Sequence, residues 1–357
     1  MKLNKKYIIG THVMFYEIDM VGEFVDSCVN SLEVIDNKEN VKFHFCLNLS
    51  EYFEKFDNPT RKDEIVDKWI AIQKHLKAYG VEVETEYYED NDKPYFIGDY
   101  RRDLNYNNCM DYDLIIWGES DCLMPRELFP SLEQVSQYAE SQNINKYVAT
   151  YGVRKMWDDS WKILQHPKFD NSTYHEMHHN TWQDDPSSIW YTMNVDEMNA
   201  INDETEAVDL RMIRYPRFDG SGLVISTDLI KNGCNVPHGV WSCGEDTGFQ
   251  NVTQQIMGPA FVQFVIRNFL KVHNRNHPLK REYVKGEKDM KTNKEKRKSN
   301  SKWMSNHETC QYNLDNVLGQ NQNKFKKLGE DNARYDNAME CYTYISSRCI
   351  SMVDTWY

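Results

Sequence analysis

The sequence lacks paired cysteines, long hydrophobic runs and an excess of basic charge. Its nine cysteines include no Cys-x-x-Cys pair, which argues against a zinc site or a disulfide framework and predicts reduced thiols. No apolar run approaches the ~20 residues that span a bilayer, and the run Tyr7-Ile8-Ile9-Gly10 is too short for the core of a signal peptide. We therefore expect a soluble, cytoplasmic protein with no transmembrane segment.

The formal net charge of −13 excludes a protein that coats nucleic acid with its whole surface. Residues 285–302 are an exception, because this low-complexity run contains eight Lys or Arg residues. Such runs are typical of solvated linkers, and they also fit contact with an anionic partner such as DNA or a lipid surface. The remaining chain is rich enough in hydrophobic residues, 40% overall, to build a core.

Strand and helix patterns alternate through the first hundred residues. Buried-strand patterns cover residues 7–16, 41–49 and 81–87, and amphipathic helix patterns cover 18–36 and 59–80 between them. This β-α-β-α-β order predicts an α/β fold with a largely parallel sheet covered on both faces. The third strand has one polar face and is expected near an edge. Residues 153–217 follow no regular pattern, and we expect an irregular region over the ligand end of the sheet.

Two carboxylates follow a further buried strand, Leu114-Ile115-Ile116-Trp117. After Gly118 the chain presents Glu119 and Asp121 with one residue between them. Sheets of this class bind ligands beyond the carboxyl ends of their strands, and carboxylate oxygens suit Mg²⁺ or Mn²⁺, especially beside phosphates. The pattern predicts a site for a metal and a diphosphate, although a single Glu-x-Asp pair is common in ordinary turns.

A second acidic motif, Gly244-Glu245-Asp246-Thr247, begins a predicted helix. Acidic residues there stabilise the exposed N–H groups, so simple helix capping is the alternative to a functional role. Two histidines, His273 and His277, follow the last apolar stretch. Each is either a metal ligand or an ordinary loop histidine bonded to the backbone.

The order of these motifs resembles the GT-A-fold nucleotide-sugar glycosyltransferases, of the broad family-2-like type. The resemblance covers roughly residues 5–280 and implies a mixed, mainly parallel sheet flanked by helices. We expect this domain to span residues 1–280, and a basic linker with a helical C-terminal extension to span 281–357. Glu119-Ser120-Asp121 would stand for the D-x-D motif of that family, with Glu in place of the first Asp.

The resemblance also implies roles for individual residues. Mn²⁺ or Mg²⁺ would be bound by Asp121, Glu119 and His273 or His277. Asp246 would be the general base of an inverting reaction, and Glu245 would contact the acceptor. The Arg-Asn pair of the family falls at Arg102 and Asn105, although two residues separate them here. The donor would be bound by Thr11, His12, Met14, Tyr16, Asn48, Arg102, Asn105, Glu119, Ser120 and Asp121.

The function implied is metal-dependent, inverting transfer of a sugar from a nucleotide-sugar, with a UDP-sugar favoured, to an acceptor hydroxyl. The acceptor is a polysaccharide or a hydroxymethylated DNA base, and the sequence does not choose between them. A sugar nucleotidyltransferase would be expected to carry a Gly-rich basic loop after the first strand, but Gly10-Thr11-His12-Val13-Met14 has one glycine and no lysine. The other alternative is a non-catalytic carbohydrate- or nucleotide-binding module.

Overall fold

The computed structural model describes residues 1–51, 56, 58, 60–93, 95–157, 160–164, 193–217, 219–238 and 244–274, with only the backbone of 153–164. His277, the basic run 285–302 and the extension expected over 281–357 lie outside these residues.

The described strands form one mixed sheet in which the long strands run in the same direction. Short strands run against them, and β9 lies between β4 and β6. This arrangement confirms the mixed, mainly parallel sheet. The order across the sheet is β3 (Glu82–Tyr88), β2 (Val41–Asn48), β1 (Tyr7–Met14), β4 (Leu114–Glu119), β9 (Leu223–Ser226), β6 (Val148–Trp157), β10 (Gln263–His273) and β5 (Cys122–Leu123), with β7 (Ser160–Leu164) on β6 and β8 (Leu210–Ile213) on β10.

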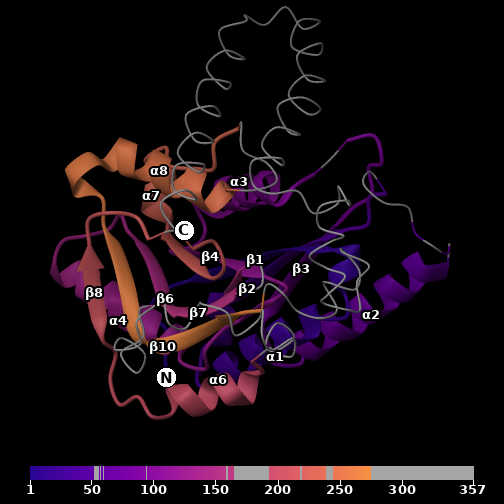
Figure 1. Ribbon diagram of the computed structural model, residues 1–357, viewed down its shortest axis with the longest axis horizontal. Helices are drawn as coiled ribbons and strands as arrows, with labels where there is room; N and C mark the ends of the chain where they lie inside the picture. The colour runs from indigo at the N-terminus through magenta and orange to yellow at the C-terminus, as the bar shows by residue number, and fades with distance from the viewer. Residues whose placement is uncertain are drawn as a thin grey trace, which may run out of the picture.

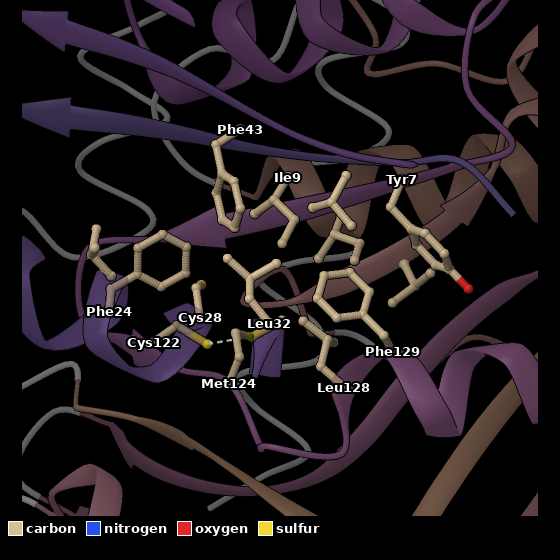
Figure 2. Close-up of a cluster of buried hydrophobic side chains, with 14 of the residues drawn as sticks. Tyr7, Ile9, Phe24, Cys28, Leu32, Phe43, Cys122, Met124, Leu128 and Phe129 are labelled. Carbon is tan, nitrogen blue, oxygen red and sulfur yellow. Dashed lines mark hydrogen bonds between the residues drawn. The ribbon is translucent and has the colours of Figure 1, made fainter. Parts of the chain in front are cut away.

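Helices cover both faces of the sheet (Figure 1). The alternation of side chains along β1 shows why, because Tyr7 and Ile9 join one apolar core and Ile8 joins the other. Figure 2 shows part of the first core, where side chains from α1 and α4 meet β1 and β2. The first core involves α1 (Val21–Leu32), α2 (Thr60–Lys77) and α4 (Leu128–Ser141), and the second involves α3 (Ile97–Asn108), α7 (Thr227–Lys231) and α8 (Glu245–Met257).

The expected β-α-β-α-β order is confirmed, and β3 lies at the edge of the sheet. The expectation of an irregular region over 153–217 is wrong where the chain is described. Strand β6 continues to Trp157 and pairs with β7, and β8 and helix α6 (Val195–Asn202) follow. A reciprocal capping box explains the start of α6, because the Asn194 side chain accepts from the Glu197 N–H and the Glu197 side chain accepts from the Asn194 N–H.

Within the described residues we looked for two features, membrane-spanning helices and disulfide bonds. In these ranges, no helix is both long enough and apolar enough to span a bilayer. The five cysteines that the structure describes are all buried free thiols, as the scattered spacing predicts.

Candidate active site

The candidate site lies where the carboxyl ends of β1, β2 and β4 meet the end of β10. In the sheet register His12 is beside Glu119, and Met14 is beside Asn48. The short strand β5 follows the acidic turn after β4 and pairs with β10, which places Cys122 opposite His273. Residues about 150 positions apart are therefore brought together by strand pairing.

Three predicted metal ligands form one cluster. One ligand atom each from Glu119, Asp121 and His273 lies within 4.8 Å of the others. His273 Nε2 is 3.0 Å from Glu119 Oε2 and 3.5 Å from Asp121 Oδ1. Two carboxylates and an imidazole at a strand end fit a divalent cation such as Mn²⁺ or Mg²⁺, with further oxygen ligands available from a diphosphate.

Charges inside this cluster depend on one another. Burial opposes ionisation of Glu119, but His273 and Arg101 outweigh it and lower its pKa to about 2. Burial likewise opposes the charged form of His273, but Glu119 and Asp121 outweigh it and raise its pKa above the usual value. A cation that binds His273 must therefore compete with a proton on that ring.

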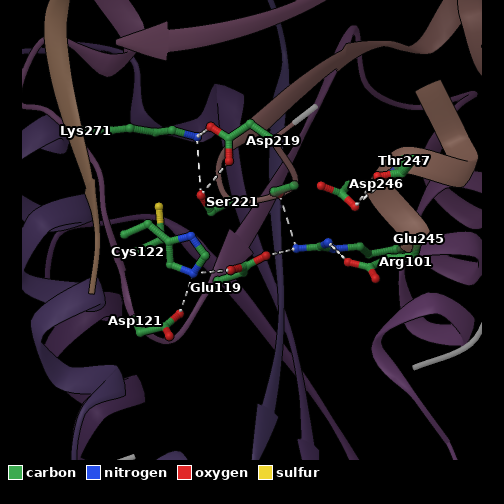
Figure 3. A network of polar contacts seen from close by, with 12 residues as sticks. Arg101, Glu119, Asp121, Cys122, Asp219, Ser221, Glu245, Asp246, Thr247 and Lys271 are labelled. Atoms are coloured by element: carbon green, nitrogen blue, oxygen red, sulfur yellow. Dashed lines mark hydrogen bonds and ion pairs between the residues drawn. The ribbon is translucent and has the colours of Figure 1, made fainter. Parts of the chain in front are cut away.

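A buried arginine that the sequence analysis did not select joins the two acidic motifs. Arg101 lies on α3, is 1% exposed, and stacks with its guanidinium carbon 4.7 Å from the Trp117 ring centre. Its Nη2 atom is 2.5 Å from Glu119 Oε1 and donates at 3.3 Å to the Gly220 carbonyl. Its Nη1 atom donates to Glu245 Oε1. Figure 3 shows this bridge between Glu119 and Glu245.

The second acidic motif starts helix α8. Gly244 precedes the helix with a φ of 69°, a left-handed conformation that favours glycine. Burial raises the pKa of Glu245 to about 7, with the neighbouring carboxylates adding to the rise and Arg101 opposing it. Asp246 is half-buried, and its Oδ1 accepts a hydrogen bond of 2.7 Å from the Thr247 N–H. Of the two acids, Glu245 is therefore bound to Arg101, and Asp246 lies in the first turn of the helix.

A second buried cation lies two residues before His273 on β10. Lys271 is fully buried, and its Nζ atom is 2.6 Å from Asp219 Oδ2. Asp219 Oδ1 also accepts from the Ser221 hydroxyl at 3.0 Å. These contacts hold the turn that contains Gly220 against the end of β10, and the sequence analysis did not identify them.

Two of the predicted donor-binding residues, His12 and Asn48, lie side by side. Asn48 Nδ2 is 3.2 Å from His12 Nε2, and it also donates to the Tyr95 carbonyl. Burial, together with Arg101, lowers the pKa of His12 to about 3, so the ring is neutral. Asn48 then donates to an unprotonated Nε2, which assigns the ring proton to Nδ1.

The other residues predicted around the first strand occupy different depths. Thr11 is fully buried, and its hydroxyl oxygen would lie 2.2 Å from a Cβ atom at Gly118, so a side chain there would displace it. Ser120, which separates Glu119 from Asp121 in the sequence, is also buried. Met14 and Tyr16 are half-buried. Met14 is the last residue of β1, and Tyr16 lies in the short turn that follows it.

Arg102 and Asn105 both contact residues 235–237, which Arg101 does not contact in any described hydrogen bond. Arg102 Nε donates to the Val236 carbonyl at 3.0 Å, and its Nη2 donates to the Pro237 carbonyl at 3.0 Å. Asn105 accepts from the Trp117 indole at 3.0 Å. Asn105 also donates through Nδ2 to Asn235 Oδ1 at 2.9 Å, so this pair is bound to residues 235–237 and Arg101 occupies the position between Glu119 and Glu245.

No family model matches the sequence, and the comparison with curated proteins also found no match. Solved structures do match. They include TarS 1–349 from S. aureus (12% identity, TM-score 0.40, 75% of this chain and 60% of that one) and GalNAc-T7 with UDP, GalNAc and Mn²⁺ (10%, 0.41, 75% and 44%). Glucosyl-3-phosphoglycerate synthase from Mycobacterium tuberculosis, in complex with Mn²⁺, UDP and phosphoglyceric acid, also matches (13%, 0.38, 79% and 74%).

The chain spans about 60% of the length of the first of these structures. The identities and TM-scores are too low to transfer a function, so the function has to be inferred from the geometry of the site.

Proposed function

We propose that this protein is a metal-dependent glycosyltransferase that moves a sugar from a UDP-sugar to an acceptor hydroxyl. The observation that carries the proposal is the cluster of Glu119, Asp121 and His273 at the strand ends, joined through Arg101 to Glu245, the first of the two acids that start α8. A cation site alone fits many functions. A cation site joined to an acid pair fits a reaction in which a diphosphate leaves and a hydroxyl loses its proton.

In the donor half, Asp121, Glu119 and His273 would hold Mn²⁺ or Mg²⁺. Such an ion would stabilise the negative charge that develops on a departing diphosphate. His12 and Asn48 line the same ends of the sheet and are assigned to the nucleotide.

In the acceptor half, Asp246 is the proposed general base and Glu245 the residue that orients the acceptor. Glu245 is bound to Arg101 and is 7% exposed, whereas Asp246 is half-buried and has a carboxylate at the helix entrance. A carboxylate within hydrogen-bond reach can accept the hydroxyl proton. One base without a covalent nucleophile corresponds to single displacement with inversion. A polysaccharide hydroxyl and a hydroxymethylated DNA base both satisfy this chemistry.

Calorimetry with UDP-sugars tests the donor half. We expect binding that depends on Mn²⁺ in the wild-type protein and is lost in Asp121→Ala, because this substitution removes a buried metal ligand. Asp111→Ala is the matched control, since Asp111 is an exposed acid at the opposite end of the same strand segment. If the wild-type protein binds no UDP-sugar in a metal-dependent way, the transferase proposal is wrong, and a non-catalytic module replaces it.

Transfer assays with Asp246→Asn test the acceptor half. This variant should bind the donor normally and lose transfer by about 10²- to 10⁴-fold, because the amide cannot accept the hydroxyl proton. Asp228→Asn, in the first turn of α7, makes the same change at another helix start and should keep full activity. Unchanged turnover in Asp246→Asn would assign the base to another residue.

A further inference from the structure

Two contacts position Glu119. Its Oε1 atom contacts Arg101 Nη2 at 2.5 Å, and its Oε2 atom contacts His273 Nε2 at 3.0 Å. If His273 and Asp121 hold a divalent ion, Arg101 keeps one carboxylate oxygen of Glu119 and leaves the other turned toward that ion.

The same guanidinium fixes the start of α8. Arg101 Nη1 donates to Glu245 while Nη2 serves Glu119 and the Gly220 carbonyl, and the guanidinium plane lies over Trp117. With 1% exposure, Arg101 cannot exchange either carboxylate for water without leaving a buried charge unpaired. The planar guanidinium serves the two carboxylates from two different nitrogens while it stacks on Trp117, and the single ammonium nitrogen of a lysine would not reproduce this geometry.

We propose that Arg101 is a positioning residue that couples the cation site to the acid pair of α8. It acts through Glu119 and Glu245 and does not itself touch the cation. While Glu245 is ionised it shares the charge and the N–H groups of Arg101. Arg101 then binds Glu119 less strongly, and Glu119 can bind the cation more strongly. When Glu245 is neutralised, Arg101 is balanced by Glu119 alone and competes with the cation for it. The inference rests on the cation site of the proposed function but requires neither a donor nor an acceptor.

Titration of the full-length protein with Mn²⁺ alone at pH 8, where Glu245 is ionised, followed by electron paramagnetic resonance and calorimetry, tests the coupling. Glu245→Gln should weaken Mn²⁺ binding by about fivefold or more, in the usual range of coupling between sites. Asp246→Asn removes the same charge from the next residue, which acts on Arg101 only through space and shares no hydrogen bond or ion pair with it among the described residues, and it should weaken binding by less than about twofold. The comparison separates the Arg101 contact from a general loss of negative charge.

Arg101→Lys provides the second arm. It keeps the charge but loses the fork, so Mn²⁺ affinity should fall on the order of tenfold, as for other residues that orient metal ligands. Adding Glu245→Gln to Arg101→Lys should then have no further effect, because the link is already broken. If Arg101→Lys does not fold, as judged by circular dichroism, the Glu245→Gln and Asp246→Asn pair still decides.

Equal effects of Glu245→Gln and Asp246→Asn, or no effect of Glu245→Gln, would overturn the inference while leaving the cation site intact. A wild-type protein that binds no Mn²⁺ would overturn both the inference and the metal-dependent function. Coupled Mn²⁺ binding without any UDP-sugar binding would support the inference and refute the transferase, so the two failures are distinguishable.

Discussion

At the scale of single residues, we expect the length of the Glu119 side chain to matter for cation binding, so that Asp cannot replace it. Asp in its place would restore the usual D-x-D pattern, but the shorter side chain withdraws the carboxylate by about 1.5 Å, one carbon–carbon bond. The contact with Arg101, now 2.5 Å, would then be lost. We expect Glu119→Asp to weaken Mn²⁺ binding on the order of tenfold, measured by calorimetry.

The control for this change is Glu23→Asp, the same shortening at an exposed position of α1. It should bind Mn²⁺ as the wild-type protein does. If Glu119→Asp also binds Mn²⁺ with wild-type affinity, the length of the side chain does not matter and Arg101 does not position this ligand.

The residues predicted as metal ligands, Glu119, Asp121 and His273, do lie together in the structure, and their binding of a metal stays a prediction. The two acids come together because both follow directly from the end of one apolar strand. The resemblance to the Arg-Asn pair of the family selected Arg102 and did not select its neighbour Arg101. Helical spacing carried a signal, since Arg101 and Asn105 are four apart and lie on one face of α3. Which of two adjacent arginines turns toward the sheet depends on the rotation of the helix against Trp117, and local sequence does not determine that rotation.

At the scale of elements, the fold was predictable where strands and helices alternate locally, and less so where pairing is long-range. The amphipathic pattern of α1 and the apolar run of β4 are enough to predict these two elements from local sequence. The two-residue strand β5 has no pattern of its own and exists because β10 pairs with it. The position of His273 opposite Cys122 therefore follows from tertiary contacts that the spacing of motifs can only imply.

The turn before β9 shows how closely such elements approach. A Cβ atom on Gly220 would lie 2.8 Å from Arg101 Nη1 and 2.9 Å from the Asp246 Cβ, so Gly220→Ala must displace one of them. We expect about 1 to 3 kcal/mol lower stability, as for other overpacked sites, and a loss of transfer activity. Urea unfolding and the transfer assay measure the two effects.

Gly22→Ala is the matched control for this substitution. A Cβ atom there would meet nothing within 4 Å, and Gly22 lies within α1. Alanine should therefore stabilise the protein by about 0.5 to 1 kcal/mol. A Gly220→Ala protein with normal stability and activity would show that the turn has room to move, contrary to the packing described.

At the scale of the whole molecule, two residues of the buried network change the stability of the fold in opposite directions as the pH rises. The lowered pKa of Glu119, about 2 against a usual 4.5, contributes stability that is present above pH 4.5 and is lost as the pH falls toward 2. The raised pKa of Glu245, about 7, acts in the other direction. Between pH 4.5 and 7 the folded protein keeps a proton on Glu245 that the unfolded chain releases, so this residue lowers stability as the pH rises.

Comparison of the wild-type protein with Glu245→Gln isolates the second effect, because glutamine does not titrate. The stability of the wild type relative to the variant should fall on the order of 3 kcal/mol from pH 4.5 to pH 8 and stay constant above it. Urea unfolding at pH 5, 6, 7 and 8 gives the difference at each pH, and general effects of the net charge cancel between the two proteins. A difference that does not change with pH would mean that Arg101 keeps Glu245 ionised throughout, so that its ion pair outweighs burial and the repulsion from Asp246 and Glu119.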